Sequence, residues 1–196
     1  MRTSLNFTYL LTAAVLTTYL FIYVGILIQR AKEVTLLRNE ISNFDYTGIS
    51  IGWSWNFAPE GNAPRDYGGS TPALFGSIGH RVEGNVISAL GTDKRTSALG
   101  DAMACIYTLG VLNGTVIRGN MCHDVAASYT GGYCLSQDQG SSNILFESNV
   151  CIRTASSSQN QHYGLNNTFR RCVSVFYNFY LMYNMTQYFT NCNTVI

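Results

Sequence analysis

A few side chains in this 196-residue chain could bind or act on a polar substrate. His162 lies in the segment QHYG, where its imidazole could orient a carboxylate or bind a sugar hydroxyl group, with a structural role as the alternative. His123 precedes Asp124 and has the same two options. Trp53 and Trp55 are separated by one residue, so both rings face one side of an extended segment. There they could stack on sugar rings or pack into a core.

The composition excludes several other kinds of site. Charged residues make up 12% of the chain and the formal net charge is +1, without a dense Lys/Arg cluster, so we expect no nucleic-acid partner. The sequence has no Gly-rich phosphate loop, no nucleophile elbow and no HExxH helix. We therefore expect neither a metal site nor a cofactor. The 11 acidic residues must supply any pair of carboxylates that acts in catalysis.

The central part of the sequence is repetitive. Residues 105–122, CIYTLGVLNGTVIRGNMC, align without a gap with residues 134–151, CLSQDQGSSNILFESNVC, at an offset of 29. A shorter core, an apolar residue followed three positions later by Asn or Cys, recurs at Leu36–Asn39, Val82–Asn85, Ile117–Asn120, Phe146–Asn149, Phe169–Cys172 and Phe189–Cys192. The steps between these cores fall from 46 to 35, 29, 23 and 20 residues. Such repetition is typical of a solenoid.

The repeat predicts an all-β fold, a right-handed parallel β-helix over residues 24–196. Each coil would keep a circuit of about 20 residues, and extra length would leave as side loops, where binding surfaces are usually built. Stacked about 4.8 Å apart, inward Asn side chains can form a hydrogen-bonded ladder. The expected ladder consists of Asn39, Asn85, Asn120 and Asn149, with Cys172 and Cys192 as small apolar residues in the same position.

The six cysteines are at positions 105, 122, 134, 151, 172 and 192, and they form no C-x-x-C pair, which excludes a zinc ribbon. Stacking would bring 105 near 134, 122 near 151 and 172 near 192. We interpret them as buried thiols that pack as small apolar side chains. Disulfides between neighbouring coils are the alternative in an oxidising compartment.

The N-terminal segment is apolar and has no charge from residue 3 to residue 29. Its length and its positively charged flanks predict a signal anchor or a transmembrane helix through residues 9–28. We accordingly expect a hydrophobic segment over residues 1–23, which could form a helix, before the β-helix. A β-strand in the second half of the run is the alternative, because Thr, Tyr, Val and Ile dominate there.

Five segments occur in a characteristic order: NEISNFDYTGISIGWSW (39–55), GDAMACIYTLG (100–110), GTVIRGNMCHDV (114–125), GGYCLSQDQGSSNILFESN (131–149) and QHYGLNNTFRR (161–171). As a set they resemble right-handed β-helix proteins related to glycoside hydrolase family 141, over roughly residues 24–176. The resemblance implies a pectin-lyase-like solenoid and, in characterised relatives, hydrolysis of glycosidic bonds in plant-type polysaccharides. The chain lacks the long N-terminal part of such proteins, so we expect a truncated solenoid.

The resemblance also implies site residues. Asp101 and Asp138 match acidic positions of the family and are the expected carboxylate pair. The alternative is that Asp101 caps a turn and Asp138 accepts hydrogen bonds from backbone amides at a corner. One would protonate the leaving oxygen and the other would activate water or attack carbon. Tyr107 matches a position that lines the cleft. Gln139 stands where relatives carry Glu, which removes a carboxylate from the site and leaves a side chain that could bind substrate.

Together these features predict a carbohydrate-active β-helix related to glycoside hydrolases, with a polysaccharide or glycan as its partner. The alternative is a non-catalytic carbohydrate-binding or surface-adhesion solenoid, which Gln139 favours. A pectate-type lyase is less expected, because the chain has few clustered acidic residues. Four N-x-Thr sequons are compatible with secretion, although Asn and Thr are common here: they begin at Asn6, Asn113, Asn166 and Asn184. We expect a monomer that is extracellular or anchored to a membrane and facing outside.

Overall fold

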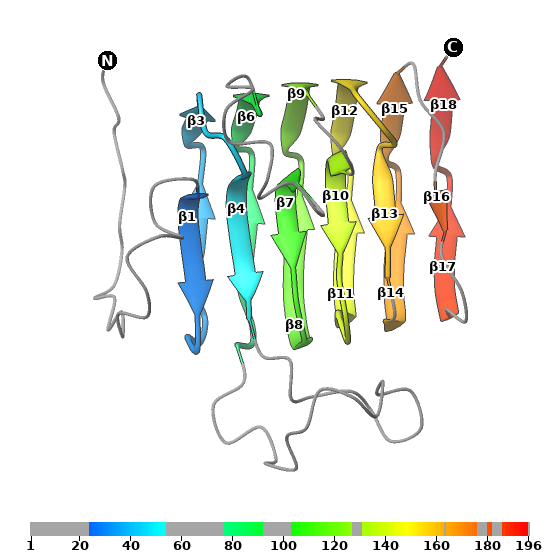
Figure 1. The fold of residues 1–196 in the computed structure, drawn as a ribbon. Coiled ribbons are helices and arrows are strands. Elements are labelled where there is room, and N and C mark those ends of the chain that lie inside the picture. The colour runs from blue at the N-terminus through cyan, green and yellow to red at the C-terminus, as the bar shows by residue number, and fades with distance from the viewer. Residues whose placement is uncertain are drawn as a thin grey trace.

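The computed structural model describes residues 24–53, 77–91, 103–126, 131–162, 164–175, 180–181 and 186–195. These residues form strands and no helix. The strands belong to three parallel sheets of six strands each, and the chain visits the three sheets in the same order in every coil. Figure 1 shows the coils stacked side by side from β1 at one end to β18 at the other. The predicted all-β parallel β-helix is confirmed.

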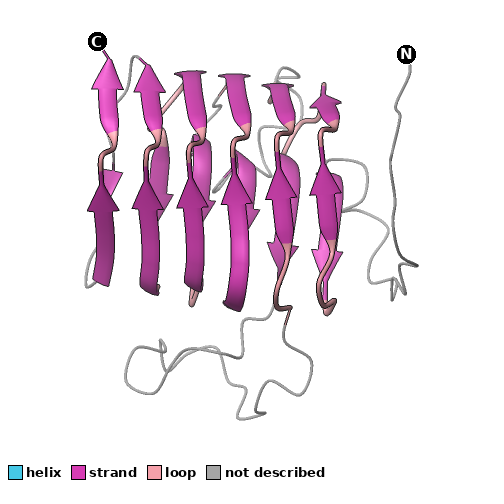
Figure 2. Ribbon diagram, turned by 180° about the vertical axis from the view of Figure 1, so that it is seen from behind, coloured by secondary structure: helices cyan, strands magenta, loops and turns pink. Residues whose placement is uncertain are grey.

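The sheets are named here in the order in which the chain visits them. Sheet I contains β1 (Val24–Gln29), β4 (Thr47–Gly52), β7 (Met103–Thr108), β10 (Gly131–Gln137), β13 (Gln159–Gln161) and β16 (Tyr180–Leu181). Sheet II contains β2 (Thr35–Leu37), β5 (Arg81–Glu83), β8 (Val111–Arg118), β11 (Ser142–Glu147), β14 (Leu165–Arg170) and β17 (Thr186–Thr190). Sheet III contains β3 (Glu40–Ser42), β6 (Val86–Leu90), β9 (Met121–Val125), β12 (Val150–Thr154), β15 (Val173–Val175) and β18 (Asn193–Val195). Figure 2 shows the same coils from behind.

The corner between sheets II and III is a two-residue turn that recurs in every coil. Its first residue has a positive φ of 53–64° in each case: Arg38, Gly84, Gly119, Ser148, Arg171 and Asn191. The left-handed residue bends the chain from sheet II into sheet III, and the next residue is the Asn or Cys of the repeat core. One local conformation, repeated six times, therefore keeps sheets II and III in register.

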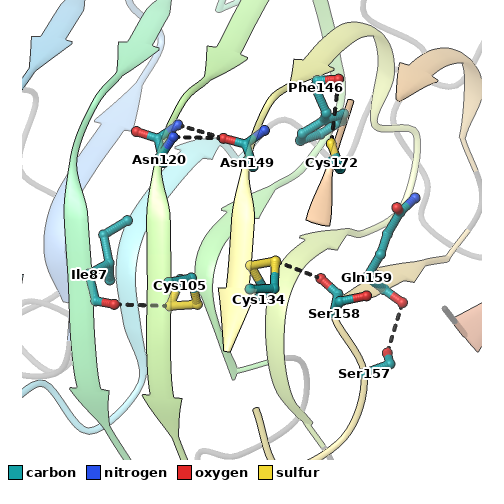
Figure 3. The surroundings of a disulfide bond; sticks show 12 residues. Ile87, Cys105, Asn120, Cys134, Phe146, Asn149, Ser157, Ser158, Gln159 and Cys172 are labelled. Atoms are coloured by element: carbon teal, nitrogen blue, oxygen red, sulfur yellow. Dashed lines mark hydrogen bonds between the residues drawn. A yellow bond between two sulfur atoms is a disulfide. The ribbon is translucent and has the colours of Figure 1, made fainter. Parts of the chain in front are cut away.

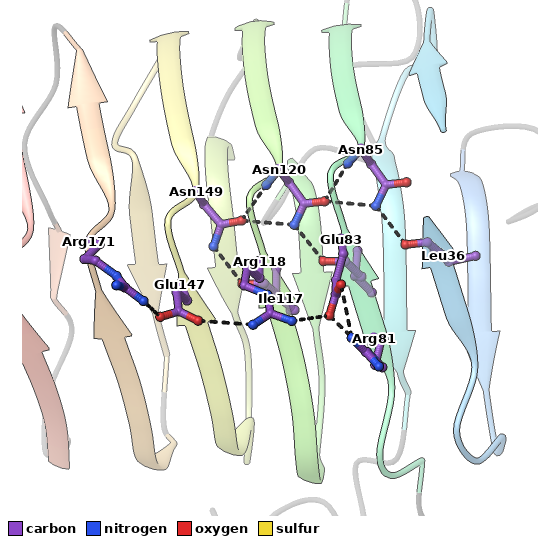
Figure 4. Close-up of polar contacts among 11 residues, drawn as sticks. Leu36, Arg81, Glu83, Asn85, Ile117, Arg118, Asn120, Glu147, Asn149 and Arg171 are labelled. Carbon is purple, nitrogen blue, oxygen red and sulfur yellow. Dashed lines mark hydrogen bonds and ion pairs between the residues drawn. The ribbon is translucent and has the colours of Figure 1, made fainter. Parts of the chain in front are cut away.

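The expected asparagine ladder occupies the second position of this turn (Figure 4). The Nδ2 atoms of Asn39, Asn85 and Asn120 each donate to Oδ1 of the next Asn along the helix axis, at 2.9, 2.9 and 3.0 Å. The same Oδ1 atoms also accept the backbone N–H of the preceding Asn, at 2.9–3.1 Å. The second Nδ2 proton of Asn85 and Asn120 goes to a strand carbonyl of the previous coil. The ladder thus satisfies buried backbone groups that the turn would otherwise leave unpaired.

The interior is built from stacks of like side chains. Leu36, Val82, Ile117, Phe146 and Phe169 pair in register across sheet II, and all five are buried. The rings of Phe146 and Phe169 lie parallel with their centroids 4.5 Å apart. These are the apolar residues of the repeat core, so the sequence repeat marks the positions that face the interior.

Sheet I differs from the other two sheets in its burial. All six residues of β4 and all six of β7 are buried, whereas strands of sheets II and III alternate, as in the exposed–buried–exposed pattern of β2. Successive side chains of a strand point to opposite faces. Both faces of sheet I are therefore covered in these coils.

The cysteine prediction is wrong for four of the six residues. Disulfides join Cys105 to Cys122 and Cys134 to Cys151, each across the interior from sheet I to sheet III of one coil (Figure 3). The predicted stacking is correct, because Cys122 and Cys151 are register partners. Stacked side chains extend in parallel directions, however, so each thiol faces the opposite sheet of its own coil rather than its neighbour in the stack.

The other two cysteines are free, as expected, and lie in the ladder position. Cys172 follows Asn149 along the axis and Cys192 follows Cys172, because Val150 pairs with Val173 and Val173 with Asn193. Burial raises the pKa of the Cys172 thiol to about 11, so this group stays protonated at neutral pH.

The N-terminal apolar run contributes a strand rather than a helix over its last residues. β1 pairs in register with β4, and both Val24 and Ile28 are buried. The expected hydrophobic segment over residues 1–23 lies outside the described residues, as do Trp55 and Asp101. Within the described ranges, no helix has the length and apolar character needed to cross a membrane.

Candidate functional site at the carboxyl ends of sheet I

Polar and aromatic side chains gather where the strands of sheet I end. Asp138 directly follows β10, and His162 directly follows β13. These two strands pair in parallel with Gln137 opposite Gln161, so the residues that follow them, Asp138 and His162, lie side by side. On its other edge β10 pairs with β7, with Gln137 opposite Thr108. Tyr107, the residue before Thr108, therefore lies next to the end of β10. Three successive coils therefore contribute one side chain each.

The carboxylate of Asp138 is the centre of this group. Its Oδ2 accepts a hydrogen bond of 2.5 Å from the Tyr107 hydroxyl. Its Oδ1 lies 2.9 Å from Nδ1 of His162 and accepts the backbone N–H of Gln139 at 2.7 Å. Both oxygens are thus held by donors from the coils before and after Asp138, which fixes the orientation of the carboxylate.

The environment keeps Asp138 ionised and Tyr107 protonated. Burial alone would raise the pKa of Asp138, but the hydrogen bonds from His162, Tyr107 and Gln139 outweigh it and hold the pKa below its usual value. Burial, followed by the charge of Asp138, raises the pKa of Tyr107. The side chains of Asp138 and His162 are 20% and 34% exposed, so this pair is the part of the group that solvent reaches.

A tight turn positions Asp138. Its backbone N–H donates to the Thr108 carbonyl at 2.9 Å, and its carbonyl accepts from the N–H of Ser141 at 2.9 Å, which closes a four-residue turn. Gly140, the third residue of the turn, has a φ of 75°, which side chains other than Gly and Asn rarely adopt. The next coil is anchored by the His162 N–H, which donates to the Gln137 carbonyl at 2.6 Å. The backbone of adjacent coils therefore sets the spacing of the Asp–His pair.

Aromatic rings extend the site toward the preceding coil. The ring centroid of Trp53 lies 5.7 Å from that of Tyr107, and the ring centroid of Tyr46, which directly precedes β4, lies 6.4 Å from that of Tyr107. Trp53 follows β4 and is half-buried. The residue before it, Gly52, has a φ of 104°, and a Cβ there would lie 2.0 Å from the Leu109 carbonyl oxygen. Only Gly allows the two coils to approach this closely, so Gly52 is what brings Trp53 against Tyr107.

The structure separates the predicted site residues into three groups. Trp53, Tyr107, Asp138 and His162 come together, and Gln139 joins them through its backbone N–H, while its half-buried side chain makes no hydrogen bond to the group. Asp101 and Trp55 lie outside the described residues. His123 lies elsewhere, on β9 of sheet III.

His123 belongs to an ion-pair cluster on sheet III. Its Nδ1 lies 2.7 Å from Asp124 Oδ2, and Arg153 of the next coil donates to both oxygens of Asp124 at 2.6 and 2.7 Å. The hydrogen bonds from Arg153 and then His123 hold the pKa of Asp124 well below its usual value. This contact gives His123 a structural role on sheet III, and its predicted role in substrate binding stays a prediction.

No family model, curated protein or solved structure matches this chain. The site is therefore interpreted from its own geometry. Within the described ranges, no group of three or more His, Cys, Asp or Glu side chains is arranged to hold a metal ion. What the group at the end of sheet I offers instead is an oriented carboxylate–imidazole pair next to two aromatic rings.

Two features of the site were not found from the sequence. Tyr46 packs near Tyr107 although it precedes it by more than sixty residues, and only the coil register brings the two together. The backbone N–H of Gln139 holds Asp138, whereas sequence reasoning considered only the Gln139 side chain. The Gly140 that follows is a turn signal that could have indicated such a backbone role.

Proposed function

We propose that this β-helix is a carbohydrate-active protein, related to the glycoside hydrolase family 141 proteins it resembles, that hydrolyses glycosidic bonds at the carboxyl ends of sheet I. The observation that carries the proposal is the Asp138–His162 contact of 2.9 Å, supported by Tyr107 and accessible to solvent. Its ligand would be a polysaccharide or glycan outside the cell.

The hydrogen bonds support a proposed role for each member of the pair. An ionised carboxylate can only accept, so the nitrogen of His162 that faces Asp138, Nδ1, carries a proton. In the neutral ring the other nitrogen is then the basic one. Asp138 therefore acts as the residue that orients His162, and His162 removes a proton from the water that attacks the anomeric carbon. Asp101, the other acid that the family resemblance assigns, would protonate the leaving oxygen.

Trp53 gives the site a surface for a sugar ring. Its half-buried indole packs against Tyr107, whose hydroxyl is bonded to Asp138. Aromatic faces pack well against the apolar faces of sugar rings, and a ring placed there would lie next to the Asp–His pair. Binding and the reacting group would thus be coupled through Tyr107.

A second candidate is a carbohydrate-binding solenoid without catalytic activity. One observation favours it: the group that the structure describes at the end of sheet I contains one carboxylate, Asp138, whereas a glycosidase normally uses two. Gln139 beside it carries no charge where relatives have Glu. In this case Trp53 and His162 would hold the glycan and nothing would be cleaved.

The test is the release of reducing ends from a panel of plant-type polysaccharides, measured together with binding to the same polymers. We expect His162→Gln and Asp138→Asn to lower kcat by about 100-fold or more, the usual contribution of general acid–base catalysis. Tyr107→Phe removes one hydrogen bond that lowers the Asp138 pKa, so the titration of the Asp138 carboxyl group, followed by NMR, should move to higher pH.

The chain provides a matched control. Asp124→Asn breaks another Asp–His contact, the 2.7 Å pair with His123 on sheet III, and should leave turnover unchanged. If the polymers bind but no reducing ends are released, the hydrolase proposal is wrong and the carbohydrate-binding solenoid takes its place. Polymers that neither bind nor are cleaved would contradict both.

A further inference from the structure

Three exposed asparagines form a row at the start of the sheet II strands. Asn113 in β8, Asn143 in β11 and Asn166 in β14 lie on consecutive coils, and each is exposed. Asn166 lies beside Asn143 because Leu145 pairs with Thr168, and Asn143 reaches Asn113 where the register between β8 and β11 shifts. The Asn143 amide Nδ2 donates to Asn113 Oδ1 at 2.6 Å. This row is separate from the buried ladder at the opposite end of the same strands.

Two members of the row are followed by threonine at the second position. Asn113 begins Asn-Gly-Thr and Asn166 begins Asn-Asn-Thr, the acceptor sequence for N-linked glycans. Asn143 begins Asn-Ile-Leu and lacks the hydroxyl residue. The fold therefore presents two acceptor sequences and one that is not an acceptor in equivalent positions.

The local geometry leaves both acceptor amides open to a bulky substituent. Asn166 has a φ of 56°, a left-handed conformation that Asn tolerates and that turns its side chain at the strand start. Asn113 uses its Oδ1 to accept the bond from Asn143, which leaves Nδ2, the atom that bears a glycan, on the other side of the planar amide. The hydroxyl residues differ: Thr115 is buried and its Oγ1 accepts the His80 N–H, whereas Thr168 is half-buried.

The disulfides give independent support for the compartment. Cys105–Cys122 and Cys134–Cys151 lie in the two coils that carry Asn113 and Asn143. Disulfides persist in oxidising environments such as the secretory pathway, which is also where N-linked glycans are attached. The same chain therefore has the bonds and the acceptor sequences of a secreted glycoprotein.

We propose that Asn113 and Asn166 are N-glycosylation sites, so that the corner between sheets I and II carries two glycans on alternate coils. The donor is a lipid-linked oligosaccharide diphosphate. Asn Nδ2 forms the new bond to the anomeric carbon, the bond from that carbon to the diphosphate breaks, and the lipid diphosphate leaves while the amide loses one proton. The coil spacing separates the two attachment points by about 10 Å, twice the distance between neighbouring strands.

The test is to direct the full chain through the secretory pathway of a eukaryotic cell and to map occupied sites by mass spectrometry. Release with a peptide N-glycosidase in ¹⁸O-labelled water marks each glycan-bearing Asn as labelled Asp. We expect label at Asn113 and Asn166 and none at Asn143. Thr168→Val should abolish the label at Asn166 alone, and Asn113→Gln the label at Asn113 alone.

A matched variant separates sequence from accessibility. Leu145→Thr gives Asn143 the missing hydroxyl residue, and label at Asn143 in this variant would show that the row is open to the transferase. Unlabelled Asn113 or Asn166 in secreted protein with both disulfides formed overturns the proposal for that residue, whatever the result for Leu145→Thr. The readout is independent of the proposed hydrolase activity, so failure of one does not affect the other.

Discussion

The turns at the two ends of the sheet II strands differ: the corner with sheet III repeats from coil to coil, and the corner with sheet I does not. At the corner with sheet III, every coil uses one left-handed residue followed by Asn or Cys, and the Asn side chains bond to one another along the axis. At the corner with sheet I, every coil differs: Trp53 follows β4, Leu109 and Gly110 follow β7, Asp138 begins a turn after β10, and His162 follows β13.

The difference suggests that one corner of each coil mainly stabilises the fold and the other is free to carry a site. A corner that repeats can satisfy its buried polar groups with its own neighbours in the stack, so its residues are constrained to one type. A corner that varies brings unlike side chains together across coils, as in the Tyr107–Asp138–His162 group, and these side chains are available to make a site. The proposed site lies at the corner that varies, and the most regular hydrogen bonds lie at the corner that repeats.

Replacing one ladder asparagine should have the largest effect on stability. Asn120→Ala removes the acceptor of the Asn85 N–H and Nδ2 and leaves these buried donors unpaired. We expect the free energy of unfolding to fall by about 4 kcal/mol, since each unpaired buried group costs about 1–3 kcal/mol. Urea denaturation measures this change.

The control for this prediction lies at the other corner. Gln139→Ala truncates a half-buried side chain of the variable corner and should change the free energy of unfolding by no more than about 0.5 kcal/mol. Similar losses for the two variants would show that the repeating corner has no special part in stability, and the comparison would fail.

The regular corner was predictable from the sequence, and the reason is physical. Stacking in register makes every coil repeat the same residue type at the same position, so the Leu36–Asn39 pattern and its successors predict both the apolar stack and the ladder. The same logic predicted that Cys122 lies beside Cys151. It could not predict the disulfides, because register fixes neighbours along the axis and says nothing about which side chains meet across the interior.

Removing one disulfide should have the second largest effect. Cys134→Ala with Cys151→Ala opens a cross-link between residues 17 apart, and a loop of this size corresponds to about 3 kcal/mol in the chain-entropy model. Cys134 lies on β10, the strand that ends just before Asp138, so the bond holds the coil that carries the site. Thermal unfolding with and without a reductant measures the loss.

Cys172→Ala is the matched control for the disulfide variant. It also removes a buried sulfur, but from a free thiol in the ladder position, and it should leave the response of the melting temperature to reductant unchanged. If the double variant unfolds at the same temperature as the wild type, the strand that positions Asp138 is held by stacking alone.

The site was only partly predictable. His162 and Trp53 were candidates because of their chemistry, and the family resemblance added Tyr107 and Asp138. The sequence repeat at an offset of 29 correctly places Thr108 opposite Gln137, but it does not show that the Tyr107 hydroxyl reaches the Asp138 carboxylate. The hydrogen bonds to both oxygens of Asp138, from which we propose an orienting role, were also not predictable from the sequence.

The smallest expected effect concerns a second ladder on the repeating corner, made of charges (Figure 4). Glu83, Arg118 and Glu147 lie on consecutive coils, and Arg118 contacts Glu83 at 2.8 Å and Glu147 at 3.6 Å. The Arg118 side chain is 44% exposed, so water screens its charge, and the buried Glu147 keeps Arg170 and Arg171 as partners when Arg118 is replaced. Arg118→Gln should lower the urea midpoint less than Asn120→Ala or the double cysteine variant does. The difference from the wild type should disappear in about 0.5 M salt, where the screening length is short. Arg118→Lys keeps the charge and should recover most of the low-salt difference. A loss for Arg118→Gln that persists in high salt would mean that packing of the arginine stem holds this corner, and the stability of the repeating corner would then rest on more than its asparagines.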